Sequence, residues 1–276
     1  MADDCYSTRL DIPLSTVLIT GGSSGIGFGL ARCFVEEGAT VIITGRREEQ
    51  LKSAAEELNR LGKKPVHYRI NDVERIDERL ALYDWIVCKH PETNILINNA
   101  GVQQRHPFIP DGNLAENIPW EEREKEIQIN ICAPMHLSQL FIAHFRQMNT
   151  TTAIMNVSSG LAFIPLASIP VYSATKAAIH SFTMSIRYQL MDEVKNLQVY
   201  EIVPPAVQTN LGGSHAFGEP LDKYCQATFE RIKKGEQEIG YGRSDQARKM
   251  ASREESDKQF LALNENIKVM FKNLKP

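Results

Sequence analysis

Cysteine is scarce in this sequence, and its placement limits what it can do. The 276 residues contain five cysteines, which lie far apart and form no Cys-x-x-Cys pair. An odd number of scattered cysteines argues against a disulfide framework and against a zinc site, and favours free thiols in a reducing compartment. We therefore predict no bound metal and a cytoplasmic location.

The sequence also lacks a surplus of basic residues and any long apolar run. Lys and Arg number 31 against 34 Asp and Glu, a formal net charge of −3, which argues against a nucleic-acid partner. No stretch approaches the ~20 apolar residues that a membrane-spanning helix needs. The first residues include acidic side chains and no apolar core of the signal-peptide type. We predict no membrane span.

What the sequence does contain is an alternation of short β-branched runs with longer amphipathic segments. Because the β-branched runs are continuously apolar, they should be strands buried on both faces, in a parallel sheet covered by helices. The expected strands are 15–20, 40–45, 64–70, 93–98, 152–158 and 197–203, and the expected helices are 25–38, 48–61, 72–88, 120–147 and 172–194. No linker divides this pattern, so residues 1–276 are expected to form a single α/β domain.

The alternation weakens after residue 204. Prolines and glycines gather in 205–220, which predicts an irregular loop beside the substrate. A helix near 221–234 and a short strand at 238–242 should follow. The last segment, about 250–274, is expected to be a helical extension that packs on the body of the protein or on a partner subunit.

A glycine-rich turn follows the first expected strand. It reads Thr-Gly-Gly-Ser-Ser-Gly-Ile-Gly at 20–27, and glycines there let the backbone approach a pyrophosphate at the positive end of the next helix. Gly21 suits the tight turn, Gly25 the close approach, and Gly27 the tight packing of helix on strand. A purely structural turn is the alternative, but the position after the first strand of a β-α series favours a dinucleotide site.

The end of the second expected strand bears on which dinucleotide binds. A carboxylate there would bind the ribose hydroxyls of NAD(H), but the chain has Arg46 and Arg47. A guanidinium binds a 2′-phosphate with charge assistance, so NADP(H) is favoured and NAD(H) is the alternative. Both arginines could instead be solvated residues at the start of a helix. Asp72, after the third strand, could bind the adenine amino group or cap the following helix.

Tyr172 and Lys176 are four residues apart on an expected helix, so their side chains project from one face. The strand before them ends near Ser159, at the edge where open α/β sheets bind ligands. Hydride transfer to a ketone needs a proton donor at the nascent alkoxide, and a phenol can serve. A neighbouring ammonium should lower the pKa of that phenol from its ordinary value near ~10. A serine hydroxyl would orient the carbonyl.

Together these motifs resemble those of the classical short-chain dehydrogenase/reductase (SDR) family. The match covers about residues 14–210, and it adds Asn-Asn-Ala-Gly at 98–101 and a helix-borne Asn130. The resemblance implies a single-domain Rossmann-type doubly wound parallel sheet with helices on both faces. It implies that Tyr172 is the general acid/base and that Ser159 orients the substrate. Lys176 would bind the nicotinamide ribose and lower the pKa of the tyrosine, and Asn130 would hold a water beside it. The order of motifs also resembles that of the DltE-like branch.

The resemblance further implies which residues contact the cofactor. They lie in the glycine-rich turn, at strand ends, on the catalytic helix and after the sixth strand: Gly21, Ser23, Ser24, Gly25, Ile26, Gly27, Arg46, Arg47, Asp72, Val73, Asn99, Ala100, Gly101, Tyr172, Lys176, Pro204, Val207 and Thr209. Two positions depart from the family pattern. Pro205 replaces a glycine, which removes one N–H and positive φ. Ser24 stands where NADP(H) users usually have a basic residue.

The substrate should lie among 160–171, the loop after residue 101, and 208–221. The first segment is strongly apolar, with Phe163, Leu166 and Ile169 as candidates, which indicates a fairly apolar small-molecule substrate; these side chains could instead pack the loop. His106 and His215 lie in the other two segments, where they could touch a polar group or simply be exposed.

We therefore predict an NADP(H)-preferring oxidoreductase that interconverts a secondary alcohol and a ketone by hydride transfer. The alternative is a non-catalytic NAD(P)-binding sensor or scaffold on the same fold. An epimerase or dehydratase is a further alternative, but such relatives often have a longer C-terminal substrate domain. The long helices at 120–147 and 172–194 could form a homodimer or homotetramer, as in relatives, or pack in the core.

Overall fold

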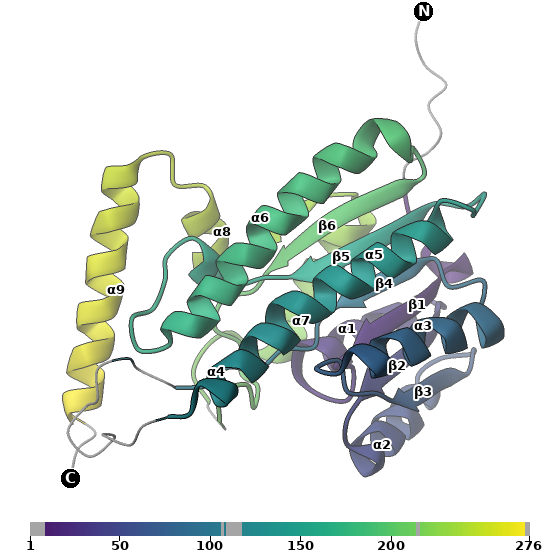
Figure 1. Cartoon of the computed structure of the whole chain (residues 1–276), viewed down its shortest axis with the longest axis horizontal. Coiled ribbons are helices and arrows are strands. Elements are labelled where there is room, and N and C mark those ends of the chain that lie inside the picture. The colour runs from purple at the N-terminus through teal and green to yellow at the C-terminus, as the bar shows by residue number, and fades with distance from the viewer. Residues whose placement is uncertain (1–8, 106–107, 109–117, 214–215, 274–276) are drawn as a thin grey trace, which may run out of the picture.

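A parallel sheet of seven strands forms the centre of the structure, in the order β3-β2-β1-β4-β5-β6-β7 (Figure 1). The computed structural model describes residues 9–105, 108, 118–213 and 216–273. The strands are β1 (Thr16–Thr20), β2 (Thr40–Gly45), β3 (Val66–Ile70), β4 (Ile95–Asn98), β5 (Thr152–Val157), β6 (Leu197–Val203) and β7 (Glu238–Gly240). The strand order reverses between β1 and β4. A ligand crevice is expected at their carboxyl ends.

Helices cover both faces of this sheet. They are α1 (Gly25–Glu36), α2 (Glu48–Asn59), α3 (Ile76–Lys89), α4 (Trp120–Ile127), α5 (Ala133–Phe145), α6 (Pro170–Glu193), α7 (Leu221–Lys233), α8 (Arg243–Arg248) and α9 (Arg253–Asn273). In Figure 1, α3, α5 and α6 lie in front of the sheet, with α1 and α7 behind it. The prediction of a doubly wound α/β fold is therefore confirmed.

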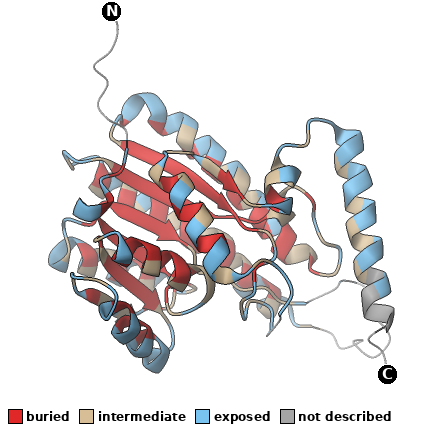
Figure 2. Ribbon diagram, turned by 180° about the vertical axis from the view of Figure 1, so that it is seen from behind, coloured by how far each residue is buried: buried red, intermediate tan, exposed pale blue. Residues whose placement is uncertain are grey.

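The sheet is buried on both sides because consecutive strand residues feed two separate hydrophobic clusters. In β1, Val17 and Ile19 pack with α1, α2 and α7, whereas Leu18 packs with α3, α5 and α6. This alternation follows from the two-residue period of a strand. Since both clusters are apolar, the central strands β1, β4, β5 and β6 appear as continuous buried bands (Figure 2), whereas the edge strand β3 is partly exposed. Continuous apolar runs in the sequence have this physical origin.

The helix expected at 120–147 is interrupted in the structure. A π-helical turn, Gln128–Cys132, separates α4 from α5. Pro134 lies in the first turn of α5, and it has no N–H to donate to the main-chain carbonyl of Asn130 four residues earlier. Single π turns inside α-helices occur often at functional sites. The interruption therefore marks the neighbourhood of Asn130.

Two other segments refine what the sequence predicts. The irregular segment 205–220 is closed at its base by an isolated bridge between Val207 and Glu219. There the N–H of Gln208 donates to the Glu219 carbonyl at 3.0 Å, and the N–H of Glu219 donates to the Ala206 carbonyl at 2.8 Å. The last strand is shorter than expected and ends at Gly240.

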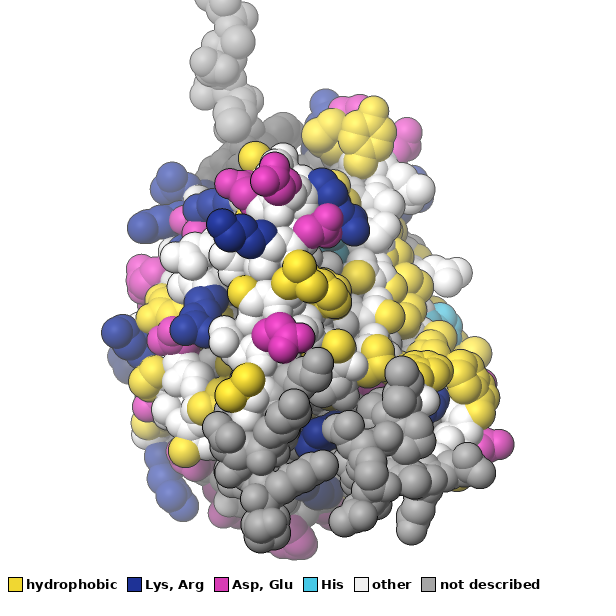
Figure 3. Space-filling model, turned by 90° about the vertical axis from the view of Figure 1, so that its left-hand side faces the viewer, with side chains coloured by type: hydrophobic (Ala, Val, Ile, Leu, Met, Phe, Trp, Pro, Cys, Tyr) yellow, Lys and Arg dark blue, Asp and Glu magenta, His cyan; other side chains and the backbone are white. Residues whose placement is uncertain are grey.

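The last helix, α9, lies beside the end of the sheet at which α6 begins (Figure 1). It is joined to the loop before α6 through Asn264, which accepts the N–H of Ala167 at 2.6 Å and donates to the Pro165 carbonyl at 3.1 Å. On the face that carries α9, hydrophobic side chains are interspersed with charged ones (Figure 3). Within the described residues, none of the helices combines the length and apolar character needed to cross a membrane.

Candidate active site

The glycine-rich turn after β1 leaves little room for side chains at its glycine positions. Gly21 and Gly25 have φ of +65° and +56°, a region that favours glycine. A Cβ on Gly21 would lie 2.9 Å from the Cα of Ala100, too close for a real contact. Ser24 precedes α1 and makes no side-chain capping bond to it. The first N–H groups of α1 therefore remain available to an anion.

The segment after β4 braces this turn. The hydroxyl oxygen of Thr20 accepts the backbone N–H groups of Asn99 and Ala100, at 3.1 and 3.0 Å. The side-chain amide of Asn99 donates to the carbonyls of Thr20 and Gly21, at 2.9 and 3.1 Å. A Cβ on Gly27 would collide with the Gly21 carbonyl and with the same amide. The turn and the segment 98–101 form one rigid unit.

The two arginines after β2 are exposed and lie close to this turn. A Cβ on the preceding Gly45 would be 3.5 Å from the hydroxyl oxygen of Ser23, so β2 ends against the turn. In the described part of the chain, no hydrogen bond or ion pair engages the side chain of Arg46 or Arg47. Both guanidinium groups are thus accessible to a ligand that occupies the turn.

Asp72 does not cap α3, which was one of its two expected roles. Its Oδ1 accepts the N–H of Glu74 at 3.1 Å, and this bond forms a turn after β3. The helix begins later, at Ile76, with Arg75 at its N-cap position. The expectation of a cap is therefore wrong, because the side chain of Asp72 closes a local turn instead. Val73, next to it, is buried in the core.

Ser159, Tyr172 and Lys176 come together at the carboxyl end of β5. Ser159 follows the strand, and the other two lie on the first turns of α6; they are 8%, 5% and 5% exposed. The Ser159 side chain lies close enough to the phenol of Tyr172 to act on its pKa. The Nζ of Lys176 donates to the Val157 carbonyl at 2.9 Å and lies 5.5 Å from the centroid of the Tyr172 ring.

Burial shifts the pKa values of this group. It raises the pKa of Tyr172 above its ordinary value; the Ser159 hydroxyl opposes the rise, and the charge of Glu126 adds to it. Burial also lowers the pKa of Lys176 to about 8, against the effect of Glu126. Desolvation of the phenolate is thus the largest effect on the phenol, and the lowering of its pKa by Lys176 stays a prediction.

Asn130 ties the interrupted helix to the loop after β4. Its Oδ1 accepts the N–H of Val102 at 2.9 Å, and its Nδ2 donates to the Val102 carbonyl at 2.8 Å and to the Thr175 hydroxyl at 3.1 Å. The side chain is thus fully engaged. Any role in holding a water beside Lys176 would fall to its main-chain carbonyl, which has no N–H donor at Pro134.

The loop after β6 reaches the glycine-rich turn despite Pro205. The carbonyl of Pro204 accepts the N–H of Gly160 at 2.9 Å, which fixes the start of the loop beside the segment after β5. A Cβ on Gly25 would lie 3.4 Å from the methyl group of Thr209. Val207 is buried at the bridge that closes the loop.

Comparison with known proteins places this arrangement in a family. The family model described as short chain dehydrogenase matches residues 15–217. The chain belongs to the short-chain dehydrogenase family. It is 40% identical over 257 residues to an oxidoreductase called DltE from Bacillus subtilis (strain 168), an alignment that covers 91% of this chain and 96% of that protein. The resemblance to the DltE-like branch is thereby confirmed, and the chain is an oxidoreductase of this family.

Solved structures share the fold over most of the chain. A short-chain dehydrogenase from Sphingobium yanoikuyae in complex with NADPH superposes with a TM-score of 0.73 at 24% identity, covering 95% of this chain and 97% of that one. A bulky-bulky ketone specific alcohol dehydrogenase from Comamonas testosteroni gives 0.72 at 21% identity, with 95% and 96% covered.

Part of the apolar segment before α6 packs inside this short-chain dehydrogenase and does not line a substrate site. The ring of Phe163 lies 4.5 Å from that of His180, two turns beyond Tyr172 along α6. Ile169 is 6% exposed and belongs to the core. Leu166 is only half-buried. Ile169 therefore serves packing, Phe163 is half-buried like Leu166, and His106 and His215 lie outside the described residues.

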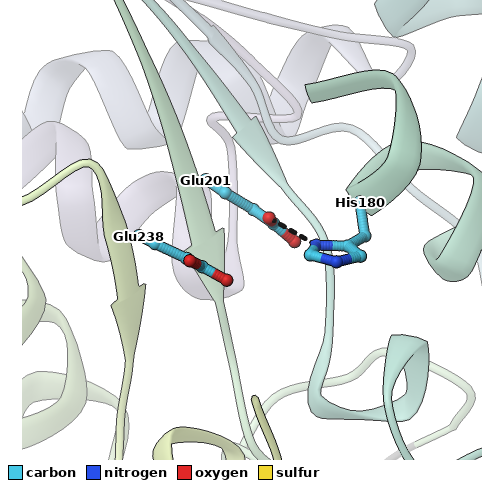
Figure 4. Close-up of side chains that lie close together, drawn as sticks. All are labelled: His180, Glu201 and Glu238. Carbon is cyan, nitrogen blue, oxygen red and sulfur yellow. Dashed lines mark hydrogen bonds and ion pairs between the residues drawn. The ribbon is translucent and has the colours of Figure 1, made fainter. Parts of the chain in front are cut away.

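Sequence reasoning missed a buried ion pair behind the catalytic helix (Figure 4). The Nδ1 of His180 lies 2.8 Å from Oε2 of Glu201, a carboxylate that is fully buried in β6. The hydroxyl of Ser158, next to Ser159, donates to the other oxygen at 2.5 Å. The bond to Glu201 raises the pKa of His180. His180 follows Lys176 by four residues, a spacing that could have placed it on the same helix face.

Glu238 lies next to this ion pair, and the three side chains have ligand atoms within 4.8 Å of one another. Arg248 is 3.9 Å from the Glu238 carboxylate, and the charge of Arg187 also acts on the pKa of His180. These cations, and a histidine whose pKa is raised, favour an ion-pair network over a metal site.

Proposed function

We propose that the protein is an NADP(H)-preferring dehydrogenase/reductase that interconverts a secondary alcohol and a ketone on a fairly apolar small molecule. The observation that carries the proposal is the grouping of Ser159, Tyr172 and Lys176 beside the glycine-rich turn. A sensor or scaffold would not need buried proton-transfer residues at that point. The proposal includes a single-domain, cytoplasmic protein.

The residues of the crevice fit a dinucleotide with a 2′-phosphate. Gly21 and Gly25 form a cradle that a Cβ would fill, and the uncapped start of α1 would bind a pyrophosphate. The exposed Arg46 and Arg47 would hold the 2′-phosphate, and Thr209 would lie beside the pyrophosphate or carboxamide. When bound, the cofactor supplies or accepts a hydride at the substrate carbon.

The chain's own residues would handle the oxygen atom of the substrate. Ser159 would donate a hydrogen bond to the carbonyl oxygen, and Tyr172 would give its proton to that oxygen as negative charge develops. Because burial raises the pKa of Tyr172, the phenol remains protonated at neutral pH, which suits reduction. Alcohol oxidation requires the reverse transfer to a phenolate. Lys176 would restore the proton.

The direct test is turnover with purified protein. NADPH oxidation should be followed spectrophotometrically with a set of apolar ketones of increasing size, alongside NADH. The bulky ketone specificity in the name of one structural neighbour supports including large substrates. Stoichiometric conversion of ketone to secondary alcohol is expected. Tight binding of the cofactor without turnover across the set would favour the sensor instead.

Replacing Arg46 with Asp is expected to reverse the cofactor preference. A lost charge-assisted hydrogen bond should weaken NADPH binding by about tenfold or more, since such bonds contribute about 1.5–3 kcal/mol, and the new carboxylate would repel the 2′-phosphate. NADH binding should change little or improve. Fluorescence titration of both cofactors measures this. Arg60→Asp, an exposed site at the other end of α2, makes the same charge change and should not alter the preference.

We also propose a homodimer or homotetramer formed through α6. Met184, Tyr188 and Met191 lie on one exposed stripe of this helix and are 52%, 78% and 60% exposed. Tyr188→Glu should therefore shift the mass measured by light scattering toward the monomer. Leu14→Glu, at a similarly exposed apolar site outside α6, should leave the mass unchanged. A monomeric wild-type protein would contradict this proposal.

A further inference from the structure

A carboxylate that no part of the proposed mechanism uses lies beside the catalytic group. Glu126 is fully buried on α4, one turn before Asn130. Its Oε1 accepts the backbone N–H of Gln104 at 3.2 Å. Among the described residues, its Oε2 has no hydrogen-bond partner, and neither has Oε1 of the Gln104 side chain. A buried carboxylate with an unpaired oxygen is unfavourable unless a charge compensates it.

The charges that compensate Glu126 come from two elements. Arg123 lies on the same helix, and Lys176 lies on α6, which packs against α4. Tyr172, also on α6, is the third titratable group that the carboxylate acts on. Both cations favour the ionised carboxylate, while burial raises the pKa of Glu126 to about 7. The carboxylate thus acts on both proton-carrying side chains of the catalytic group.

Apart from Glu126, little around Lys176 stabilises the positive charge of its ammonium group. Within the described residues, its hydrogen bond goes to a neutral acceptor, the Val157 carbonyl. Burial disfavours the ammonium, and the attraction of Glu126 is the influence that opposes burial. A Cβ on Gly101 would lie 3.3 Å from Oδ1 of Asn130 and 3.7 Å from Nζ of Lys176, so this ammonium faces the same loop that Glu126 and Asn130 hold.

We propose that Glu126 is a positioning residue that acts through Lys176: its carboxylate keeps the buried amine charged, and so able to bind ribose hydroxyls and return a proton to Tyr172. The role in turnover rests on the proposed function, whereas the effect on Lys176 does not. Loss of this charge would leave a neutral amine over part of the neutral range.

The alternative is that Glu126 only clamps Gln104. Glu126→Gln separates the two roles because the amide oxygen still accepts the N–H of Gln104, while the charge is gone. A clamp alone predicts no change in the titration of Lys176. The charge role predicts that Lys176 loses its proton at lower pH.

The first experiment follows Lys176 by NMR in protein labelled with 13C at the lysine ε-carbon, without cofactor. The resonance is assigned by its absence from Lys176→Arg. In Glu126→Gln the midpoint of titration should fall by about one pH unit, the lower end of what a neighbouring opposite charge produces. Glu126→Asp should give an intermediate midpoint. Glu124→Gln, an exposed carboxylate on the same helix, should leave the midpoint unchanged.

An unchanged midpoint in Glu126→Gln would overturn the proposal. Should that variant fail to fold, Glu126→Asp replaces it, since withdrawing the carboxylate by one methylene also weakens the interaction, and an unchanged midpoint there has the same meaning. Where turnover is found, the high-pH limb of kcat/KM for reduction should move to lower pH in Glu126→Gln. A shifted midpoint in a protein without turnover would support the role of Glu126 and refute the proposed function.

Discussion

Tyr172→Phe is expected to abolish turnover while the fold and cofactor binding remain. Tyr172 is 5% exposed, and phenylalanine preserves its packing, so the change removes only the hydroxyl and its interaction with Ser159. No other described side chain at the carboxyl end of β5 offers an acidic proton in the same place. Loss of a positioned general acid should lower kcat by about 10²–10⁴-fold. Steady-state NADPH oxidation with the best ketone measures the loss.

A second buried tyrosine provides the control. Tyr200 lies in the core of β6, and its hydroxyl donates to Gln198 rather than to any catalytic residue. Tyr200→Phe should keep its kcat, even if the melting temperature falls slightly. If Tyr172→Phe retained more than a tenth of the wild-type kcat, another group would have to supply the proton. Equal cofactor affinity in both variants would establish that only chemistry was lost.

Local patterns predicted the strands well because the reason for each strand is local. The run 40–45 is β-branched at every position but the last, and it forms β2 with the expected bounds because both faces of the sheet are covered. The prediction of a continuous helix at 120–147 was wrong at one place. Its apolar period continues through 128–132, and the period does not reveal that Pro134 and the polar contacts of Asn130 favour a π turn.

The candidate site also has parts that could be predicted from the sequence and parts that could not. Tyr172 and Lys176 could be paired from their spacing, because four residues on a helix fix their relation. The pKa of the phenol could not be predicted, because it depends on how completely α4, β5 and α6 exclude water. Glu126 looks like one of several acidic residues in a charged helix. Only the packing of α4 on α6 distinguishes it as buried.

His180→Ala is expected to destabilise the fold strongly while leaving the catalytic side chains intact. Among the described side chains, it would leave Glu201, which is 0% exposed, with only the hydroxyl of Ser158 as a hydrogen-bond partner. Removing one member of a buried ion pair lowers the free energy of unfolding by about 3–5 kcal/mol. The lower end is expected, since the side chain of His180 is 22% exposed. Urea denaturation at pH 6 measures the change.

The pH dependence of this loss distinguishes the ion pair from simple packing on Phe163. The bond to Glu201 raises the pKa of His180 above its unfolded value, near ~6.5. Its contribution is therefore complete below that value and is lost as the pH rises through the raised pKa. The difference in unfolding free energy between wild type and His180→Ala should shrink over that range. Adding Glu201→Gln should recover part of the loss at pH 6, because it removes the uncompensated charge. A difference that is constant with pH, and not reduced by the second change, would mean that the imidazole contributes through its contact with Phe163 alone.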